Sequence, residues 1–370
     1  MPALTATAAA TIEDVQVAAF RIPTDYPESD GTLTWEATTL VVVQIRAGDQ
    51  QGVGYTYASA AAARLIADTL VELVVGADPL HVAGLWSAMF ARLRNQGDRG
   101  LVACAISAVD AALWDLKART LGLPLVELIG SVQAGLPVYG SGGFTSYDDG
   151  QLQEQFAGWA DCGIHDFKMK VGRDPAADVH RVRTARATIG PHAGLFVDAN
   201  GAYTPRQAVA AAARFADEAG INWLEQPLPP DDLAGLRFVR ERLPAAVELA
   251  DGEYGYTTGD FRRLLESGAV DVVMADATRC GGITGFLKVA TLCEAWHLPL
   301  SAHCAPALHL HLGCSIEGLR HAEYFHDHAR IEHLLFEGAA TPEHGVLTPD
   351  RTRPGLGLEF KWSDAARYAA

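Results

Sequence analysis

Three carboxylates follow three short apolar runs at a nearly constant step. Asp198, Glu225 and Glu253 are separated by 225 − 198 = 27 and 253 − 225 = 28 residues, and a helix-like segment fills each gap. A strand–helix–strand repeat of this length is typical of parallel βαβ units. Carboxylates at the carboxyl ends of neighbouring parallel strands lie close together, and they repel one another unless a cation lies between them. An all-oxygen site of this kind suits Mg²⁺ or Mn²⁺.

Two further groups could move protons beside such a cation. Lys168 and Lys170 alternate on an expected strand, so both side chains point into the same space. A second lysine and a divalent cation nearby would lower the pKa of Lys170 and make it a base near neutral pH. Asp276 and His303 end two later strands, and a carboxylate beside an imidazole fixes its tautomer and raises its basicity. We expect Lys170 and His303 on opposite sides of a substrate.

Several other residues are candidates for contact with a substrate. Glu337 ends the last expected strand and could, if protonated, donate a hydrogen bond to a developing oxyanion. Arg279 is either a substrate contact or one half of an ion pair at the barrel mouth. Tyr26 and Trp35 belong to a polar, turn-rich span, residues 23–36, which we interpret as a mobile flap over the site; a plain hairpin tip is the alternative.

Some residues admit two interpretations. Asp251 lies two residues before Glu253, so both would face the same way on a strand, and Asp251 would replace Glu253 as a metal ligand if the strand register slipped. Asp110 and Asp115 on an expected helix are interpreted as surface or capping charges. Five histidines resemble a metal cluster only by their number, and we interpret them as helix-surface or core residues: His309, His311, His321, His326 and His328.

The elements that position these residues are those of a β/α barrel. From residue 131 to about 345, strands and helices alternate, and the steps between strand ends from Lys170 onward are 28, 27, 28, 23, 27 and 34 residues. Eight such strands are the number in a closed barrel, whose active site lies at the carboxyl ends of the strands. An open doubly wound sheet is the rival, and the lack of a dinucleotide fingerprint disfavours it. The expected strand ends are Tyr139, Lys170, Asp198, Glu225, Glu253, Asp276, His303 and Glu337.

The first part of the chain predicts a separate α+β capping domain. Residues 1–130 read as three strands, at 15–20, 38–45 and 52–56, followed by several helices. Residues 131–345 are the barrel domain, and the tail at 346–370 is expected to pack back on the capping domain.

Composition limits the possible partners and compartment. The 370-residue chain has a formal net charge of −16, which argues against nucleic acid and anionic membranes. Six cysteines without a Cys-x-x-Cys pair are typical of a reduced, cytoplasmic protein. The start of the chain, residues 1–11, has no features of a signal peptide. A small carboxylate substrate is the expected partner.

Taken together, these motifs resemble the enolase superfamily, mandelate racemase subgroup. The resemblance covers essentially the whole chain and implies a modified TIM barrel, (β/α)7β, with an α+β cap. It implies one Mg²⁺ per subunit held by Asp198, Glu225 and Glu253, abstraction of a proton α to a carboxylate, and a homo-oligomer between dimer and octamer. The motifs that carry it are Lys168-x-Lys170, Asp198-Ala199-Asn200, Glu225-Gln226-Pro227, Gly252-Glu253, Asp276 with His303, and Phe336-Glu337-Gly338.

The expected reaction is dehydration of a sugar acid. Proton abstraction would form an enediolate stabilised by Mg²⁺, Lys168 and Glu337, with Asn200 holding a substrate hydroxyl and His303 protonating the leaving hydroxyl. The alternative is a racemase or epimerase of 2-hydroxy acids. A third possibility is a barrel that only binds a metal and a ligand, which the presence of Lys170, Asp276 and His303 disfavours.

Overall fold

The computed structural model describes residues 11–370. No helix in this part of the chain is long and apolar enough to cross a membrane. The expectation about a signal peptide falls on residues 1–11, of which residues 1–10 lie outside the described range.

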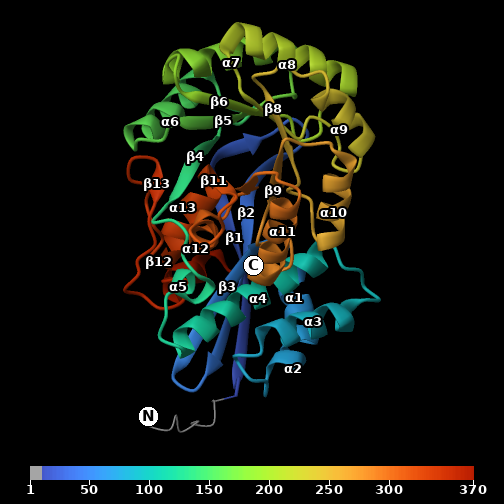
Figure 1. The fold of residues 1–370 in the computed structure, drawn as a ribbon. Coiled ribbons are helices and arrows are strands. Elements are labelled where there is room, and N and C mark those ends of the chain that lie inside the picture. Colours follow the sequence, from blue (N-terminus) through green and yellow to red (C-terminus); the bar gives the residue numbers. More distant parts are fainter. Residues whose placement is uncertain (1–10) are drawn as a thin grey trace.

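The part of the chain from residue 136 to residue 325 is a closed barrel, as the sequence predicts. Within the described residues, eight parallel strands follow one another in sequence order, and β11 pairs with β4 to close the ring (Figure 1). Seven helices connect the strands, so the barrel is (β/α)7β. The strands are β4 (Leu136–Gly142), β5 (Asp166–Lys170), β6 (Gly194–Asp198), β7 (Trp223–Glu225), β8 (Glu248–Asp251), β9 (Val272–Ala275), β10 (Leu300–Ala302) and β11 (Leu319–Phe325). The helices are α6 (Asp149–Asp161), α7 (Pro175–Ile189), α8 (Pro205–Ala219), α9 (Leu233–Arg240), α10 (Thr258–Ser267), α11 (Gly282–Ala295) and α12 (Pro306–Gly313).

The alternation of side chains along each strand places the ionisable groups at one end of the barrel. A small apolar cluster fills the barrel interior. Because successive side chains on a strand point to opposite faces, residues two positions further along point into the same space. Asp198 follows Phe196 in this way, and Glu225 follows Trp223. The members of the interior cluster are Tyr139, Phe196, Trp223, Ala250, Val272 and Met274.

The eighth strand is not where the sequence analysis expected it. β11 ends at Phe325, whereas the expected end, Glu337, lies on the two-residue strand β12 (Phe336–Glu337) outside the barrel, which pairs with β14 (Glu359–Phe360). The sequence Leu-Arg-His-Ala-Glu-Tyr-Phe of β11 has no apolar run, because two of its interior positions carry His321 and Glu323. The 34-residue step from His303 to Glu337 is the longest of the series, and it spans both the true strand and the helix that follows it.

The cap is an antiparallel sheet covered by helices. Its strands β1 (Asp14–Ser29), β2 (Thr34–Ala47) and β3 (Gln50–Tyr57) are paired in that order, and they extend from the cap helices to the barrel (Figure 1). The C-terminal tail contacts this sheet, since Phe20 pairs with Ala369 and Trp362 donates a hydrogen bond to Gln44. The helices are α1 (Ala61–Leu65), the π-helical turn η1 (Ile66–Leu70), α2 (Val71–Val74), α3 (Val82–Leu93), α4 (Leu101–Thr120) and α5 (Leu125–Ile129). Helix α13 (His326–Leu335) follows β11, and the tail contains β13 (Val346–Leu347), α14 (Trp362–Ala365) and the 3₁₀ turn η2 (Ala366–Tyr368).

Residues 23–36 form the hairpin tip that was the alternative to a mobile flap. β1 continues to Ser29, with irregular pairing between Pro23 and Glu28. The tip of the hairpin lies against the barrel, because a Cβ added to Gly31 would meet the carbonyl oxygen of Ala199 at 2.4 Å. Arg173 donates a hydrogen bond to the carbonyl of Asp30 at 2.9 Å. The hairpin is therefore attached to the barrel by backbone contacts.

Helix α4 connects the cap to the rest of the chain through buried carboxylates. Asp110 accepts hydrogen bonds from Thr284 N and Oγ1, at 2.8 and 2.7 Å, at the start of α11. Asp115 accepts from Val53 N in the cap sheet and from Leu356 N in the tail, at 2.8 and 2.6 Å. The interpretation of both as surface charges is wrong, since both are fully buried; Asp110 does cap a helix, but one in the barrel.

We predict that Asp110→Ala destabilises the protein through this connection. The substitution leaves two buried donors of Thr284 without a partner, which costs about 1–3 kcal/mol per unsatisfied group. Urea unfolding monitored by circular dichroism would measure the loss. Asp68→Ala, at an exposed residue of η1 paired with Arg64, is the control, with an expected change within about 0.5 kcal/mol. Equal stability of the two variants would contradict the prediction.

Candidate active site

A cavity of about 350 Å³ lies between the barrel mouth and the cap hairpin. Both parts of the chain line it. The barrel contributes Lys170, Asn200, Glu253, Tyr254, Arg279, His303, Cys304, Glu323, Phe325 and His328, and the cap contributes Asp30, Trp35, Ala37, Thr38, Thr39, Tyr57, Ala58 and Ser59.

Asp198, Glu225 and Glu253 converge at this mouth, as the sequence predicts. One oxygen of each lies within 4.8 Å of an oxygen of the others, and all three residues are buried. Burial raises the pKa of Glu225 to about 8, and Glu253 Oε2 makes no well-aligned hydrogen bond to any described residue although it lies 3.2 Å from His303 Nε2. Three desolvated carboxylates with an unpaired oxygen fit a hard divalent cation such as Mg²⁺. We refer to these three residues as the carboxylate triad.

Asp251 is not an alternative member of this triad. Ala250 belongs to the interior cluster, so the alternating strand turns Asp251 outward. Gly252 then reverses the direction, with φ of 132° and no room for a Cβ, which would lie 2.3 Å from Met274 O. This bend brings Glu253 back to the mouth. The expectation that Asp251 and Glu253 face the same way is therefore wrong.

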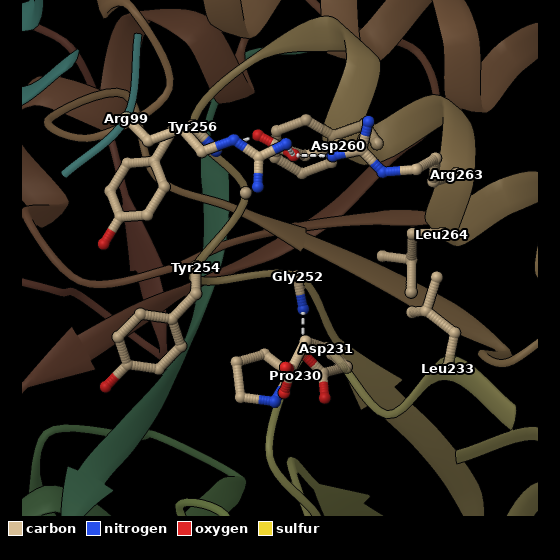
Figure 2. Close-up of a pocket in the computed structure, with 13 residues that line it drawn as sticks. Arg99, Pro230, Asp231, Leu233, Gly252, Tyr254, Tyr256, Asp260, Arg263 and Leu264 are labelled. Carbon is tan, nitrogen blue, oxygen red and sulfur yellow. Dashed lines mark hydrogen bonds and ion pairs between the residues drawn. The ribbon is translucent and has the colours of Figure 1, made fainter. Parts of the chain in front are cut away.

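Asp251 lines a second pocket, of about 490 Å³, between β8 and the helices around it. Figure 2 shows Tyr254 and Tyr256 on one side of this pocket and Leu233 and Leu264 on the other. Its arginines, Arg99 and Arg263, are both paired with Asp260 (Figure 2). Burial raises the pKa of Asp251 to about 8. Although this pocket is larger, it contains none of the triad, and we place the chemistry in the cavity under the hairpin.

The two lysines of β5 are buried among the carboxylates. Lys168 is paired with Glu225 and lies 2.8 Å from Glu323, and Lys170 Nζ lies 2.6 Å from Asp198 Oδ2. Burial alone would lower the pKa of Lys170, but the carboxylates of Asp198, Glu323 and Glu225 together raise it above its usual value. The protein groups alone thus raise the pKa of Lys170. We expected a lowered pKa, and that expectation depends on the positive charge of a bound cation.

His303 and Asp276 form the expected dyad. His303 Nδ1 lies 2.9 Å from Asp276 Oδ2, and Asp276 Oδ1 accepts from Thr278 N and Oγ1 at 2.7 Å each. Burial would lower the pKa of His303, but Cys304, Glu253 and Glu323 raise it well above its usual range. With Nδ1 directed at Asp276, Nε2 is the nitrogen that faces the cavity. Lys170 is at the end of β5 and His303 follows β10. The strands β6, β7 and β8, whose ends carry the triad, lie between β5 and β10 in the barrel. Lys170 and His303 therefore approach the cavity from different strands.

The structure places Glu323, not Glu337, at the site. Glu323 on β11 is fully buried, accepts from Ser141 Oγ at 2.6 Å, and lies 3.6 Å from His303 Nε2. Burial would raise the pKa of Glu323, but Lys168 and His303 hold it well below its usual range. The side chain of Glu337 is 72% exposed and lies near Arg353, so the expectation for Glu337 is wrong. The signal in the sequence was the alternation of His321 and Glu323 within the overlong last step.

The five histidines between 309 and 328 serve mostly as neutral supports. His309 Nε2 accepts from Ala277 N at 2.9 Å, and its Nδ1 then donates to Cys304 O at 2.9 Å. His328 Nδ1 accepts from Ala305 N at 3.2 Å, and its ring stacks on Tyr57 at 3.4 Å. Burial lowers the pKa of His328 to about 3, so the ring is neutral and carries one proton. Because Nδ1 accepts a hydrogen bond, that proton is on Nε2. His328 lines the cavity and was missed as a possible substrate contact.

The proposed substrate contacts are only partly brought together. Asn200 lines the cavity, with φ of 46° and an Oδ1 that is buried and has no hydrogen bond to any described residue. Trp35 lines the cavity and donates to Glu28 at 2.8 Å. Arg279 lines it too, and lies 3.5 Å from both Glu253 and Asp276. The ion-pair interpretation of Arg279 is therefore confirmed, and its contact with a substrate stays a prediction. Tyr26 does not line the cavity, and instead packs edge-on against Tyr147 in another pocket.

Comparison with known proteins identifies the two parts of the chain. Residues 12–130 match the model of the mandelate racemase / muconate lactonizing enzyme N-terminal domain, and residues 151–365 match that of the enolase C-terminal domain-like family. The chain is 34% identical to the 3,6-anhydro-α-L-galactonate cycloisomerase of Streptomyces coelicolor, over 95% of this chain and 98% of that protein. It is 32% identical to the L-talarate/galactarate dehydratase of Salmonella typhimurium, over 84% and 81% of the two chains.

Solved structures show the same fold. A mandelate racemase/muconate lactonizing enzyme-like protein from Rubrobacter xylanophilus superimposes with a TM-score of 0.95 at 52% identity, covering 97% of this chain and all of that one. A racemase from Streptomyces coelicolor A3(2), solved with bound magnesium, gives a TM-score of 0.90 at 32% identity, with coverage of 97% and 100%.

We predict that Mg²⁺ binding distinguishes Glu253 from Asp251. Glu253→Gln removes a charged ligand and is expected to weaken Mg²⁺ binding on the order of tenfold or more. Asp251→Asn, two residues away but directed outward, is the matched control and is expected to bind Mg²⁺ like the unmodified protein. Isothermal titration calorimetry measures both without an activity assay. Weaker binding by Asp251→Asn than by Glu253→Gln would contradict the assignment.

Proposed function

Because the chain belongs to the enolase superfamily, in the mandelate racemase and muconate lactonizing enzyme family, we propose that it is a magnesium-dependent hydro-lyase acting on a sugar acid. The proposed reaction dehydrates an aldonate or aldarate to a 2-keto-3-deoxy acid. One observation carries the proposal: Lys170 and the Asp276–His303 dyad approach one cavity from different strands, with the carboxylate triad between them. The names of the relatives, which include an acid-sugar dehydratase and an anhydro-galactonate cycloisomerase, support an acid-sugar substrate.

Abstraction of a proton α to a carboxylate is the difficult step, because the enediolate carries a second negative charge. When bound by the carboxylate triad, magnesium supplies positive charge where that negative charge develops. Lys168 adds a fixed positive charge in the same buried region. Lys170 or His303 takes the α-proton, according to which face of the substrate presents it.

The second step expels the β-hydroxyl. His303, protonated on Nε2 and oriented by Asp276, gives its proton to the leaving oxygen, and the resulting enol becomes the 2-keto acid. Glu323 takes the position expected of Glu337. An arriving substrate carboxylate would raise the pKa of Glu323 by like-charge repulsion, so that it could donate a hydrogen bond to the developing oxyanion.

The cavity wall suits a polyhydroxylated substrate. Asn200 Oδ1 is a buried acceptor without a hydrogen bond to any described residue. His328 also lines the cavity, and its Nε2–H is a donor because its Nδ1 accepts from Ala305 N. Asp30, Thr38 and Ser59 add polar groups from the cap. We propose that Asn200 and His328 hold substrate hydroxyls, and that Trp35 limits the far end of the cavity.

A second candidate reaction is favoured by the anhydro-galactonate cycloisomerase relative. In a 3,6-anhydro acid the oxygen on C3 is β to the carboxylate, so the same α-abstraction followed by loss of that oxygen opens the ring without releasing water. Racemisation or epimerisation, the alternative that the sequence suggests, follows if the opposite base returns a proton to the same carbon.

We predict that a screen of mono- and diacid sugars with Mg²⁺ identifies a substrate. The 3,6-anhydro acids belong in the library, and 2-keto acid is detected by semicarbazone absorbance. His303→Asn is expected to lower kcat by about 10²- to 10⁴-fold, because the variant lacks the acid for the leaving oxygen. No 2-keto acid from any acid in the library would contradict elimination and leave racemisation as the reaction.

Two glutamates provide the matched control for this assay. Glu323→Gln is expected to lower kcat strongly, because it removes a buried negative charge beside Lys168 and His303. Glu337→Gln, at the exposed position that the sequence suggested, is expected to retain full activity. The opposite order of effects would contradict the placement of the site.

A further inference from the structure

Cys304 follows His303 at the end of β10, and the proposed reaction makes no use of its thiol. The residue is buried, with 4% of its surface exposed. Its Sγ lies 3.3 Å from His303 Nε2 and 3.4 Å from Glu323 Oε2, and those two atoms are 3.6 Å apart. A sulfur, an imidazole nitrogen and a carboxylate oxygen thus form a nearly equilateral triangle.

The size of this triangle matches one face of a tetrahedral zinc site. With Zn–S of about 2.3 Å and Zn–N and Zn–O of about 2.0–2.2 Å, tetrahedral geometry separates sulfur from nitrogen or oxygen by about 3.5–3.7 Å, and nitrogen from oxygen by about 3.3–3.5 Å. The observed separations of 3.3, 3.4 and 3.6 Å lie within about 0.2 Å of these values. All three residues also line the cavity, so a fourth coordination position would be open to water or to a substrate, as in zinc sites with three protein ligands.

The backbone holds the thiol in place. Cys304 and Ala305 both have left-handed conformations, with φ of 53° and 40°, which are strained for residues other than glycine. Hydrogen bonds maintain the turn: Cys304 N donates to Glu323 Oε2 at 3.1 Å, His309 Nδ1 donates to Cys304 O at 2.9 Å, and Ala305 N donates to His328 Nδ1 at 3.2 Å. The ligand atoms are therefore positioned before any ion arrives.

We propose that His303, Cys304 and Glu323 form a second metal site, which binds a thiophilic divalent cation such as Zn²⁺. It has its own ligands but lies next to the carboxylate triad, since Glu253 Oε2 is 3.2 Å from His303 Nε2. Thiolate and imidazole ligands select such cations, whereas the all-oxygen triad suits Mg²⁺. Burial raises the pKa of the Cys304 thiol to about 12, so binding of the ion releases a proton as the sulfur becomes a ligand.

Occupation of this site inhibits the enzyme. The ion takes His303 Nε2, the atom that would protonate the leaving oxygen, and it takes an oxygen of Glu323. This consequence rests on the proposed function, whereas the binding of the ion does not.

Cobalt tests the binding directly. Co²⁺ is added to the full-length protein at saturating Mg²⁺, so that the triad is already filled. Co²⁺ bound to a thiolate absorbs in the near ultraviolet by sulfur-to-cobalt charge transfer, and oxygen ligands do not produce this band. We expect the band in the unmodified protein and in Cys162→Ser, which removes an exposed thiol. We expect its loss in Cys304→Ser, whose folding is checked by its thermal unfolding and by its Mg²⁺ binding.

Two results would overturn the proposal. Absence of the band from the unmodified protein would show that the three side chains form only a hydrogen-bonded cluster. A band of equal strength in Cys304→Ser would show that another cysteine binds the cobalt.

Zinc tests the inhibition. With the substrate from the screen and saturating Mg²⁺, the Zn²⁺ concentration that halves activity is expected to rise at least about tenfold in Cys304→Ser, each variant being measured relative to its own uninhibited rate. An unchanged concentration would overturn the inhibitory role and place the action of zinc at the carboxylate triad. If no acid sugar is a substrate, the cobalt band still decides whether the metal site exists.

Discussion

The concentration of buried negative charge at the barrel mouth is the constraint on which the rest of the site depends. Five carboxylates meet there with three permanently cationic side chains and with His303, so negative charge is in excess, and a divalent cation would offset it. Charges removed from water are costly unless they are paired. The same arrangement that requires a cation also provides the positive field that a developing enediolate needs. The carboxylates are Asp198, Glu225, Glu253, Asp276 and Glu323, and the cations are Lys168, Lys170 and Arg279.

The remainder of the fold holds this cluster together and covers it. The barrel supplies one or two inward-pointing groups from each of several strands, and the apolar interior cluster beneath them keeps water out from below. The cap hairpin closes the cavity from above, attached to the barrel through Gly31 and Arg173. Helix α4 fixes the cap to the barrel by carboxylates buried in the interface, so the position of the hairpin depends on residues far from the chemistry.

Much of this arrangement could be predicted from the sequence, because strand ends in a parallel barrel must converge. The regular steps placed Lys170, Asp198, Glu225, Asp276 and His303 correctly. The prediction failed where the local pattern was interrupted. β11 carries polar residues that face a buried site and so lacks an apolar run, which moved the expected glutamate from 323 to 337. Gly252 reverses the alternation of β8, which no period-two pattern can show. The packing of Tyr26 against Tyr147 and the burial of Asp110 against Thr284 could not be predicted, because both depend on contacts between residues far apart in the sequence.

We propose that the protein forms an enediolate between two bases on different strands. Deuterium incorporation at the α-carbon of the substrate tests this proposal most directly, and it is followed by NMR in D₂O with Mg²⁺ and the acid sugars of the screen. Exchange or elimination is expected in the unmodified protein and is expected to disappear in the Lys170→Ala, His303→Asn double variant, while Mg²⁺ binding persists. Undiminished exchange in the double variant, or no exchange and no elimination with any acid in the unmodified protein, would contradict the account.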